Sequence, residues 1–189
     1  MMRELVAKSR TYRRFHQDQS LPREILVELV ETARLIPTAG NKQPLKYAIS
    51  CDEARNGVVF PTLAWAAYLK DWPGPGEGER PAGYIVIFGD TEISEHVQWD
   101  HAIAAQTICL AAAEKGLGAC IIGAVDRTRL KAALAVPSTC EVLLVVALGY
   151  PAETVVMDPI KDGDCKYWRD ADGVHHVPKR PMEEILLDL

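Results

Sequence analysis

The feature that most constrains the fold of this chain is the apolar segment Ala102–Ala113. Only Gln106 and Thr107 interrupt it, and half of its residues are alanine. A helix that is apolar nearly all round is buried on most sides, so this part of a predicted helix over 94–115 has to be covered from several directions. In a chain of 189 residues we expect a second subunit to cover part of it, since small side chains let two such helices approach closely.

Length and composition narrow the other possibilities. The 189 residues fit a single domain, 1–189, that can bury a sizeable core. A net charge of −5 argues against a nucleic-acid-binding protein. No apolar run reaches the ~18–20 residues of a transmembrane helix, and no apolar signal segment follows the first methionines. We therefore expect a cytoplasmic protein that binds neither nucleic acid nor membrane.

The cysteines and histidines give no sign of a disulfide framework or a metal site. The five cysteines are widely spaced and form no Cys-x-x-Cys pair: Cys51, Cys109, Cys120, Cys140 and Cys165. Such a set is typical of reduced thiols in the cytosol. We expect most of them to be buried structural residues, with a catalytic thiol as the alternative. His96 and His101 lack the spacing of a ligand pair on one helix face, so no metal is predicted.

The hydrophobic patterns predict an α+β fold. Helices are expected at 1–8, 21–35, 62–72, 94–115 and 127–135, and strands at 47–50, 84–88, 119–122 and 141–149. The polar tail 151–189 is predicted to form an arm, in which 166–169 and 174–177 can pair as a hairpin across Asp170–Gly173. The aromatic segment 62–72 is either core packing or a wall over a flat ligand, and 73–81 is predicted to be a mobile surface loop.

Three polar segments are the candidates for a functional site. Arg10-Thr11-Tyr12-Arg13-Arg14-Phe15 can clamp a phosphate, because guanidinium groups donate in a planar fork; the alternative is a solvated basic patch. Pro37-Thr38-Ala39-Gly40-Asn41-Lys42-Gln43-Pro44 offers a hydroxyl and two side-chain amides, although it can also be an ordinary helix-to-strand connection. Pro178-Lys179-Arg180 adds two late cations.

These segments, in this order and together with Gly116-Leu117-Gly118, resemble the nitroreductase family of flavin mononucleotide (FMN) enzymes. The family has an Arg-Ser-x-Arg-x-Phe segment, a Pro-Ser-x-x-Asn-x-Gln-Pro loop, a Gly-Leu-Gly segment after a long apolar helix and a late Pro-Lys pair. Thr11 and Thr38 replace the two serines and keep their hydroxyl groups. The resemblance implies a central, mainly antiparallel sheet flanked by helices, with a C-terminal arm, 151–189, that extends to the partner subunit of a homodimer.

The resemblance also implies which residues bind FMN at the subunit interface. Phosphate and ribityl contacts fall to Arg10, Thr11, Arg13 and Lys179, and Arg180 is assigned with them although the family's second basic residue is often displaced by one or two positions. The second subunit would contribute Pro37, Thr38, Ala39, Asn41 and Gln43. The backbone of Ile122 and Gly123 would lie beside the flavin ring, with the Ile122 N–H near N5.

The family's chemistry takes place on FMN, so no catalytic residue is nominated. The resemblance implies that hydride from NADH or NADPH reaches N5 and that electrons pass to a small-molecule acceptor such as a nitroaromatic or a quinone. The residues around that acceptor are not identified by the sequence, although 62–81 is a candidate region. The alternative is a non-catalytic flavin-binding or flavin-sequestering protein of the same fold.

Overall fold

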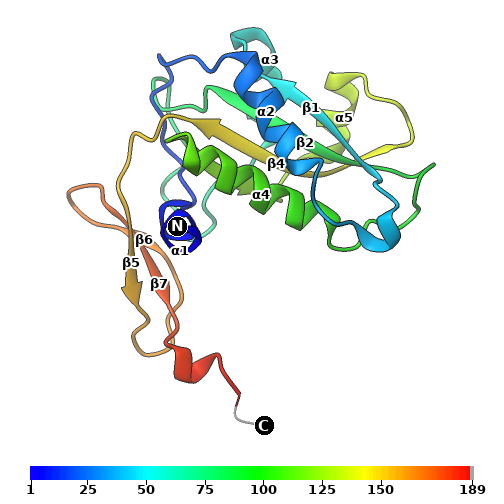
Figure 1. Ribbon diagram of the computed structural model, residues 1–189. Coiled ribbons are helices and arrows are strands. Elements are labelled where there is room, and N and C mark those ends of the chain that lie inside the picture. Colours follow the sequence, from blue (N-terminus) through cyan, green and yellow to red (C-terminus); the bar gives the residue numbers. More distant parts are fainter. Residues whose placement is uncertain (188–189) are drawn as a thin grey trace.

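A computed structural model of the protein describes residues 1–187. Its centre is an antiparallel sheet in the order β1–β2–β4–β3 (Figure 1). The strands are β1 Leu45–Ser50, β2 Gly83–Asp90, β3 Gly118–Ile122 and β4 Cys140–Gly149. Every residue of β2 except Asp90 is buried, which explains the continuous apolar run of this central strand. The α+β prediction with a mainly antiparallel sheet is confirmed.

Helices cover both faces of the sheet and create two cores. The helices are α1 Met2–Lys8, α2 Arg23–Ala33, α3 Glu53–Val59, α4 Asp100–Glu114 and α5 Arg127–Leu134. Ile85 and Ile87 of β2 point to the core beneath α2 and α4. Tyr84, Val86 and Phe88 point to the core beneath α3 and α5. This alternation is the two-residue period of a strand that is buried on both faces.

Helix α4 is shorter than the predicted helix over 94–115. It begins at Asp100, and Gly116, with φ +75°, terminates it in the left-handed conformation that glycine adopts easily. One face of α4 is buried against the sheet, but Ile103 is 39% exposed and Trp99 just before the helix is 73% exposed. A single chain therefore leaves apolar surface open beside α4. No helix within residues 1–187 is long and apolar enough to cross a membrane.

The predicted helix over 62–72 is wrong. A short 3₁₀ helix, Phe60–Thr62, is followed by irregular chain that runs beside residues 124–126. Leu63 forms a bridge with Val125, the Ala64 N–H donates to the Ala124 carbonyl, and the Asp126 N–H donates to the Thr62 carbonyl. These tertiary hydrogen bonds outweigh the helical spacing of the aromatic residues.

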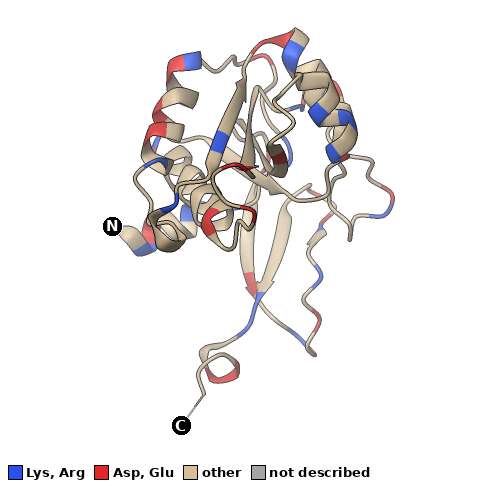
Figure 2. Ribbon diagram, turned by 90° about the vertical axis from the view of Figure 1, so that its right-hand side faces the viewer, with Lys and Arg blue, Asp and Glu red and all other residues tan. Residues whose placement is uncertain are grey.

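The C-terminal arm begins after Tyr150 and forms a second, three-stranded sheet. Its strands are β5 Val155–Pro159, β6 Trp168–Arg169 and β7 His175–Lys179. β6 and β7 pair antiparallel, which confirms the predicted hairpin, and β5, which was not predicted, pairs parallel with β7. The arm runs past α1 and away from the main sheet, ending in a 3₁₀ turn at Met182–Glu184 (Figure 1). Basic and acidic residues both occur along it (Figure 2).

Two adjacent histidines of β7 have opposite environments. His175 is fully buried, and desolvation together with the Arg13 guanidinium lowers its pKa to about 4. His176 bonds to the carboxylates of Asp158, at 2.8 Å, and Asp170, at 3.2 Å, which raise its pKa, and its ring stacks on Trp168. His175 is therefore neutral in the fold at neutral pH, whereas His176 is stabilised in its charged form.

Substitution of these histidines should change the pH dependence of stability in opposite directions. Between pH 6.5 and about 4 the unfolded chain binds a proton that folded His175 does not, so His175 costs stability as the pH falls. His176, with its raised pKa, contributes stability at low pH and loses it as the pH rises through its folded pKa. We expect His175→Gln to lose less stability than the wild type between pH 7 and pH 4.5, and His176→Gln to lose more.

The measurement is the urea midpoint at both pH values, followed by tryptophan fluorescence at a fixed protein concentration. Each variant is compared with itself, so a loss of packing that is independent of pH cancels. Identical pH dependence in the wild type and both variants would contradict the assigned environments.

Candidate functional site

The arginine segment Arg10–Phe15 lies in a notch made by two glycines at the edge of the sheet. Gly118 of β3 pairs with Gly149 of β4. A Cβ added to Gly118 would lie 2.9 Å from the Tyr12 ring, and one added to Gly149 would lie 2.9 Å from Phe15. Only glycine permits this close approach. Phe15 is fully buried as a result, and the segment is held against the ends of both strands.

Backbone pairing fixes the segment at both ends. Thr11 forms a parallel bridge with Ala119, and the Tyr12 N–H donates to the Ala119 carbonyl at 3.0 Å. Phe15 forms an antiparallel bridge with Pro151, at the start of the arm. The predicted residues Arg10, Thr11 and Arg13 are thus brought together on one extended stretch between the sheet and the arm.

The guanidinium groups of Arg10 and Arg13 face the arm. Arg10 donates to the Val6 carbonyl at 2.6 Å and to the Met157 sulfur at 3.2 Å. Arg13 lies 3.0 Å from Nε2 of His175 and 4.5 Å from the ring centre of Tyr167. None of these partners is a carboxylate, so neither guanidinium group is neutralised by direct contact with an anionic side chain.

Several donors around these arginines are buried without an acceptor. Because Arg13 always donates, Nε2 of His175 has to accept and its ring proton lies on Nδ1. That Nδ1, the Nε of Arg10 and the Nε of Arg169 have no hydrogen-bond partner within residues 1–187. Buried donors without partners are rare in folded proteins. A group of positive charges with unsatisfied donors fits an anion such as the phosphate of FMN.

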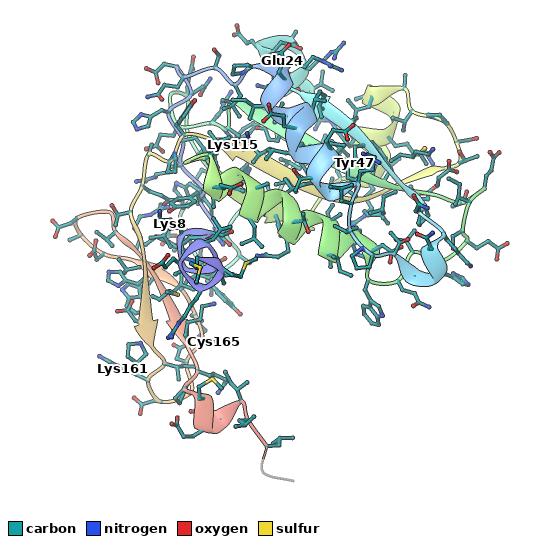
Figure 3. The ribbon with its side chains drawn as sticks, in the orientation of Figure 1. Lys8, Glu24, Tyr47, Lys115, Lys161 and Cys165 are labelled. Atoms are coloured by element: carbon teal, nitrogen blue, oxygen red, sulfur yellow. The ribbon has the colours of Figure 1, made fainter. Side chains whose placement is uncertain are left out.

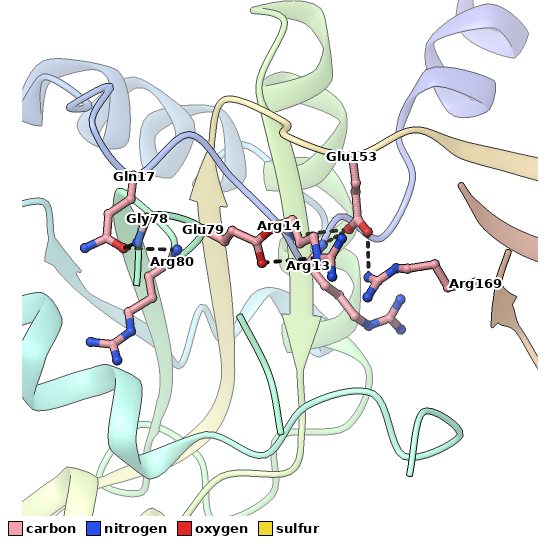
Figure 4. A network of polar contacts seen from close by, with 8 residues as sticks. All are labelled: Arg13, Arg14, Gln17, Gly78, Glu79, Arg80, Glu153 and Arg169. Carbon is pink, nitrogen blue, oxygen red and sulfur yellow. Dashed lines mark hydrogen bonds and ion pairs between the residues drawn. The ribbon is translucent and has the colours of Figure 1, made fainter. Parts of the chain in front are cut away.

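Glu153 and Arg169 complete this cluster, although neither was among the residues predicted for the site. The Glu153 carboxylate accepts from the backbone N–H groups of Arg13 and Arg14, and it accepts from the Arg169 side chain at 2.8 Å (Figure 4). Arg169 also stacks over the ring of Trp72, 4.8 Å from its centre. Both residues lie in the polar tail, where no local spacing marks them as partners of a segment about 140 residues earlier.

The loop 73–81 is less free than predicted, because its second half is tied to the arginine segment. The Phe15 N–H donates to the Glu79 carbonyl, and the Gln17 side chain accepts from the backbone N–H groups of Gly78 and Arg80 (Figure 4). A cavity of about 940 Å³ lies beside these residues, with Phe60 and Arg80 in its wall. None of the predicted cofactor residues lines it, so it is separate from the arginine cluster.

The late cations are not part of the cluster in this single chain. Lys179 is exposed at the end of β7, opposite Pro159. Arg180 forms an ion pair with Glu184 at 2.6 Å, and both side chains are about half exposed. Within the described chain neither residue has a hydrogen bond or ion pair with Arg10 or Arg13. Their predicted role at the same phosphate stays a prediction.

The polar loop Pro37–Gln43 has a fixed backbone and an exposed surface. Gly40, Asn41 and Gln43 all have φ between +53° and +59°. The Thr38 hydroxyl oxygen accepts from the Gln43 N–H at 3.2 Å, and the Gln43 side chain donates to the Asn41 carbonyl. Left-handed backbone at non-glycine residues is uncommon and is concentrated at functional sites. The loop is therefore pre-organised for contacts outside itself.

Helix α4 separates this loop from the arginine segment. The Ala39 N–H donates to the Asp100 carboxylate, at the first residue of α4, at 2.9 Å. The arginine segment lies beyond the other end of the helix, against Gly118. A helix of 15 residues is about 22 Å long. Asp100 is buried. Burial of Tyr47, labelled in Figure 3, together with the nearby Asp100 charge raises the pKa of Tyr47 to about 12.

Ile122 and Gly123 lie at the end of β3, where Arg127 holds the backbone in place. Ile122 is buried and Gly123 is exposed. The Arg127 guanidinium donates to the Gly123 carbonyl at 3.1 Å and to the Val142 and Leu143 carbonyls at 3.1 and 3.3 Å. These two carbonyls lie at a bulge in β4, where the pairing with β2 shifts register. The Arg127 guanidinium thus links the end of β3 to the neighbouring strand β4.

Cys109 and Cys120 are poorly suited to act as nucleophiles. Cys109, Cys120 and Cys140 are buried, and burial raises the pKa of both Cys109 and Cys120 to about 12. Cys165 is exposed on the arm (Figure 3). A thiol with so high a pKa is a poor nucleophile. No group of three or more His, Cys, Asp or Glu side chains in residues 1–187 is placed to hold a metal ion.

Comparison with known proteins shows which family this chain matches. Residues 6–150 match the model of the nitroreductase family. An Archaeoglobus fulgidus protein, provisionally named an NADH dehydrogenase/NAD(P)H nitroreductase, is 27% identical over 148 residues, which cover 74% of this chain and 80% of that protein. The 5,6-dimethylbenzimidazole synthase of Rhodospirillum rubrum is 26% identical over 168 residues, covering 76% and 79% of the two chains.

Solved structures share the fold. The nitroreductase family protein of Streptococcus pneumoniae TIGR4 aligns over 100% of both chains, with a TM-score of 0.70 at 17% identity. A Parabacteroides distasonis protein, provisionally named an NADH dehydrogenase/NAD(P)H nitroreductase, aligns over 89% of this chain and 96% of its own, with a TM-score of 0.66 at 21% identity. The family match extends from the arginine segment to the end of β4, and on this evidence the chain is an oxidoreductase that belongs to the nitroreductase family.

Proposed function

We propose that this protein is an NAD(P)H-dependent oxidoreductase that uses FMN. The observation that carries the proposal is the cluster of uncompensated guanidinium groups and unpartnered buried donors around Arg10 and Arg13. A dianionic phosphate would pair with the Arg10 and Arg13 guanidinium groups through charge-assisted hydrogen bonds. The names of several relatives, which include NAD(P)H nitroreductases, support NADH or NADPH as the source of electrons.

The chain's own residues would bind and orient the cofactor without supplying a catalyst. Arg10, Thr11 and Arg13 would hold the phosphate, joined by Lys179 and Arg180. Backbone groups at Ile122 and Gly123 would lie along the ring. The polar atoms of the loop would reach the ring from another chain: Pro37, Thr38, Ala39, Asn41 and Gln43. Bound FMN would supply the redox chemistry, accepting hydride at N5 and passing electrons to a small molecule such as a nitroaromatic or a quinone.

A homodimer would bring the two halves of this site together. The loop and the arginine segment lie at opposite ends of α4 in one chain, so a two-fold axis that packs the exposed faces of two α4 helices can place one chain's loop near the other chain's arginines. The exposed Ile103 and Trp99 supply apolar surface for that contact. In this proposal residues 1–189 act as one domain, and its arm, 151–189, embraces the partner.

The reductase proposal is tested by adding NADH or NADPH to the purified protein with FMN under anaerobic conditions. We expect the visible absorbance of oxidised flavin to disappear with at least one of the two nucleotides. FMN that stays bound and oxidised with both would instead support the non-catalytic flavin-binding alternative.

Removal of Arg10 or Arg13, the two cations proposed to clamp the phosphate, should weaken FMN binding. We expect Arg10→Ala and Arg13→Ala each to raise the Kd for FMN, because each loses a charge-assisted contact that contributes about 1.5–3 kcal/mol, roughly ten- to a hundredfold in affinity. Flavin fluorescence quenching measures the Kd. The control is Arg34→Ala, since Arg34 is exposed and pairs with Glu31 on α2. Wild-type affinity in both clamp variants would mean that the segment is a solvated basic patch.

A charge on the exposed face of α4 should both separate the subunits and weaken FMN binding. We expect Ile103→Glu to sediment as a monomer and to bind FMN poorly, although Ile103 is not among the predicted flavin contacts. A stable dimer interface buries on the order of 2,000 Å², and a buried unpaired carboxylate at its centre is strongly unfavourable.

The control for this variant is Val58→Glu. Val58 is 36% exposed on α3, which covers the opposite face of the sheet. Analytical ultracentrifugation at micromolar concentration, with and without FMN, distinguishes the two variants. If Ile103→Glu gave a folded monomer that still bound one FMN per chain, the shared site would be disproved.

A further inference from the structure

We propose that Glu153 is a positioning residue of the phosphate clamp, which it orders through the backbone of Arg13 and Arg14. This inference rests on the proposed FMN function. Glu153 lies four residues after the end of β4, in the first turn of the arm. Its side chain is only 1% exposed, although a carboxylate is costly to bury unless it is fully paired.

The contacts of Glu153 pair both oxygens of its buried carboxylate. One carboxylate oxygen accepts from the N–H groups of both Arg13 and Arg14, the latter at 3.1 Å, and the other accepts from Arg169 at 2.8 Å (Figure 4). Two successive amides directed at one oxygen restrict the backbone of both residues. The direction in which the Arg13 side chain leaves the backbone is therefore set by Glu153.

The carboxylate leaves the guanidinium group of Arg13 free of negative charge. Within residues 1–187 its polar contact is with His175 and its cation–π contact is with Tyr167, and neither partner is a carboxylate. Glu153 thus orders a cation without neutralising it by direct contact. Arg169 continues the network onto β6 of the arm, so the same carboxylate joins the N-terminal segment, the end of the core and the arm.

Two physical models of Glu153 predict opposite effects on FMN. If only long-range charge mattered, loss of a carboxylate near the phosphate would remove a repulsion and FMN would bind more tightly. If Glu153 acts by positioning, its loss would let Arg13 leave the orientation that the phosphate needs, and FMN would bind more weakly in spite of the gain in positive charge. Riboflavin, which lacks the phosphate, would respond little in either case.

The experiment measures the Kd of FMN and of riboflavin for the full-length protein and its Glu153→Gln variant by flavin fluorescence. We expect the Kd for FMN to rise roughly ten- to a hundredfold, as for loss of a charge-assisted hydrogen bond, while the Kd for riboflavin changes less than threefold, about the scatter of such contributions. The matched control is Glu79→Gln. Glu79 pairs with the side chain of Arg14 at 3.2 Å and is 40% exposed, but its carboxylate does not contact the backbone of Arg13. Its FMN affinity should stay at the wild-type value or improve.

Glu153→Asp provides a second variant that keeps the charge and withdraws the carboxylate by one methylene. It should also lower the ratio of FMN to riboflavin affinity, and it decides the question if Glu153→Gln does not fold. An unchanged or higher FMN affinity in the folded Glu153 variants would overturn the proposal, and so would equal losses for FMN and riboflavin. If the wild-type protein bound no FMN, the proposed function itself would be disproved.

Discussion

The close contact of Tyr12 and Phe15 with a pair of glycines is the constraint on which the candidate site depends. Gly118 and Gly149 face each other at the ends of β3 and β4, and any larger residue at either position would collide with an aromatic ring. The fully buried Phe15 anchors the extended segment at this notch. The contacts of the Tyr12 ring with Gly118 and of the Phe15 ring with Gly149 fix the backbone from which the neighbouring arginines project.

The arm depends on the same anchor, because its first residue, Pro151, pairs with the buried Phe15. The Ala152 N–H donates to the Arg14 carbonyl, and the Glu153 side chain accepts from the same stretch of backbone. The N-terminal segment and the arm are thus adjacent at the edge of the sheet although they are far apart in sequence. This geometry explains why a basic cluster forms in a protein with a net charge of −5: local placement, and not overall composition, determines the potential at a site.

The sequence predicted the elements whose signals are local. The strands of the main sheet were visible as continuous apolar runs, and α5, which Asp126 caps by accepting from the Arg129 N–H, lies within the predicted helix over 127–135. Helix α3 was missed although Asp52 caps it in the same way. The helix over 62–72 was wrong because hydrogen bonds to residues 124–126 outweigh its periodicity. Glu153 and Arg169 could not be found, since their importance arises only from contacts made by folding.

The contacts of the cluster also show how the chain itself orders the proposed anion site. Arg34 and Arg180 are held by carboxylates that contact their guanidinium groups, and such ion pairs compete with any other anion. Arg13 is ordered instead by a carboxylate on its backbone, by an aromatic ring and by a neutral histidine. Since none of these contacts cancels its charge, the side chain can be rigid and still attract a phosphate. Pre-organisation of this kind lowers the entropy lost on binding, and under the proposed function it places the arm among the elements on which FMN affinity would depend.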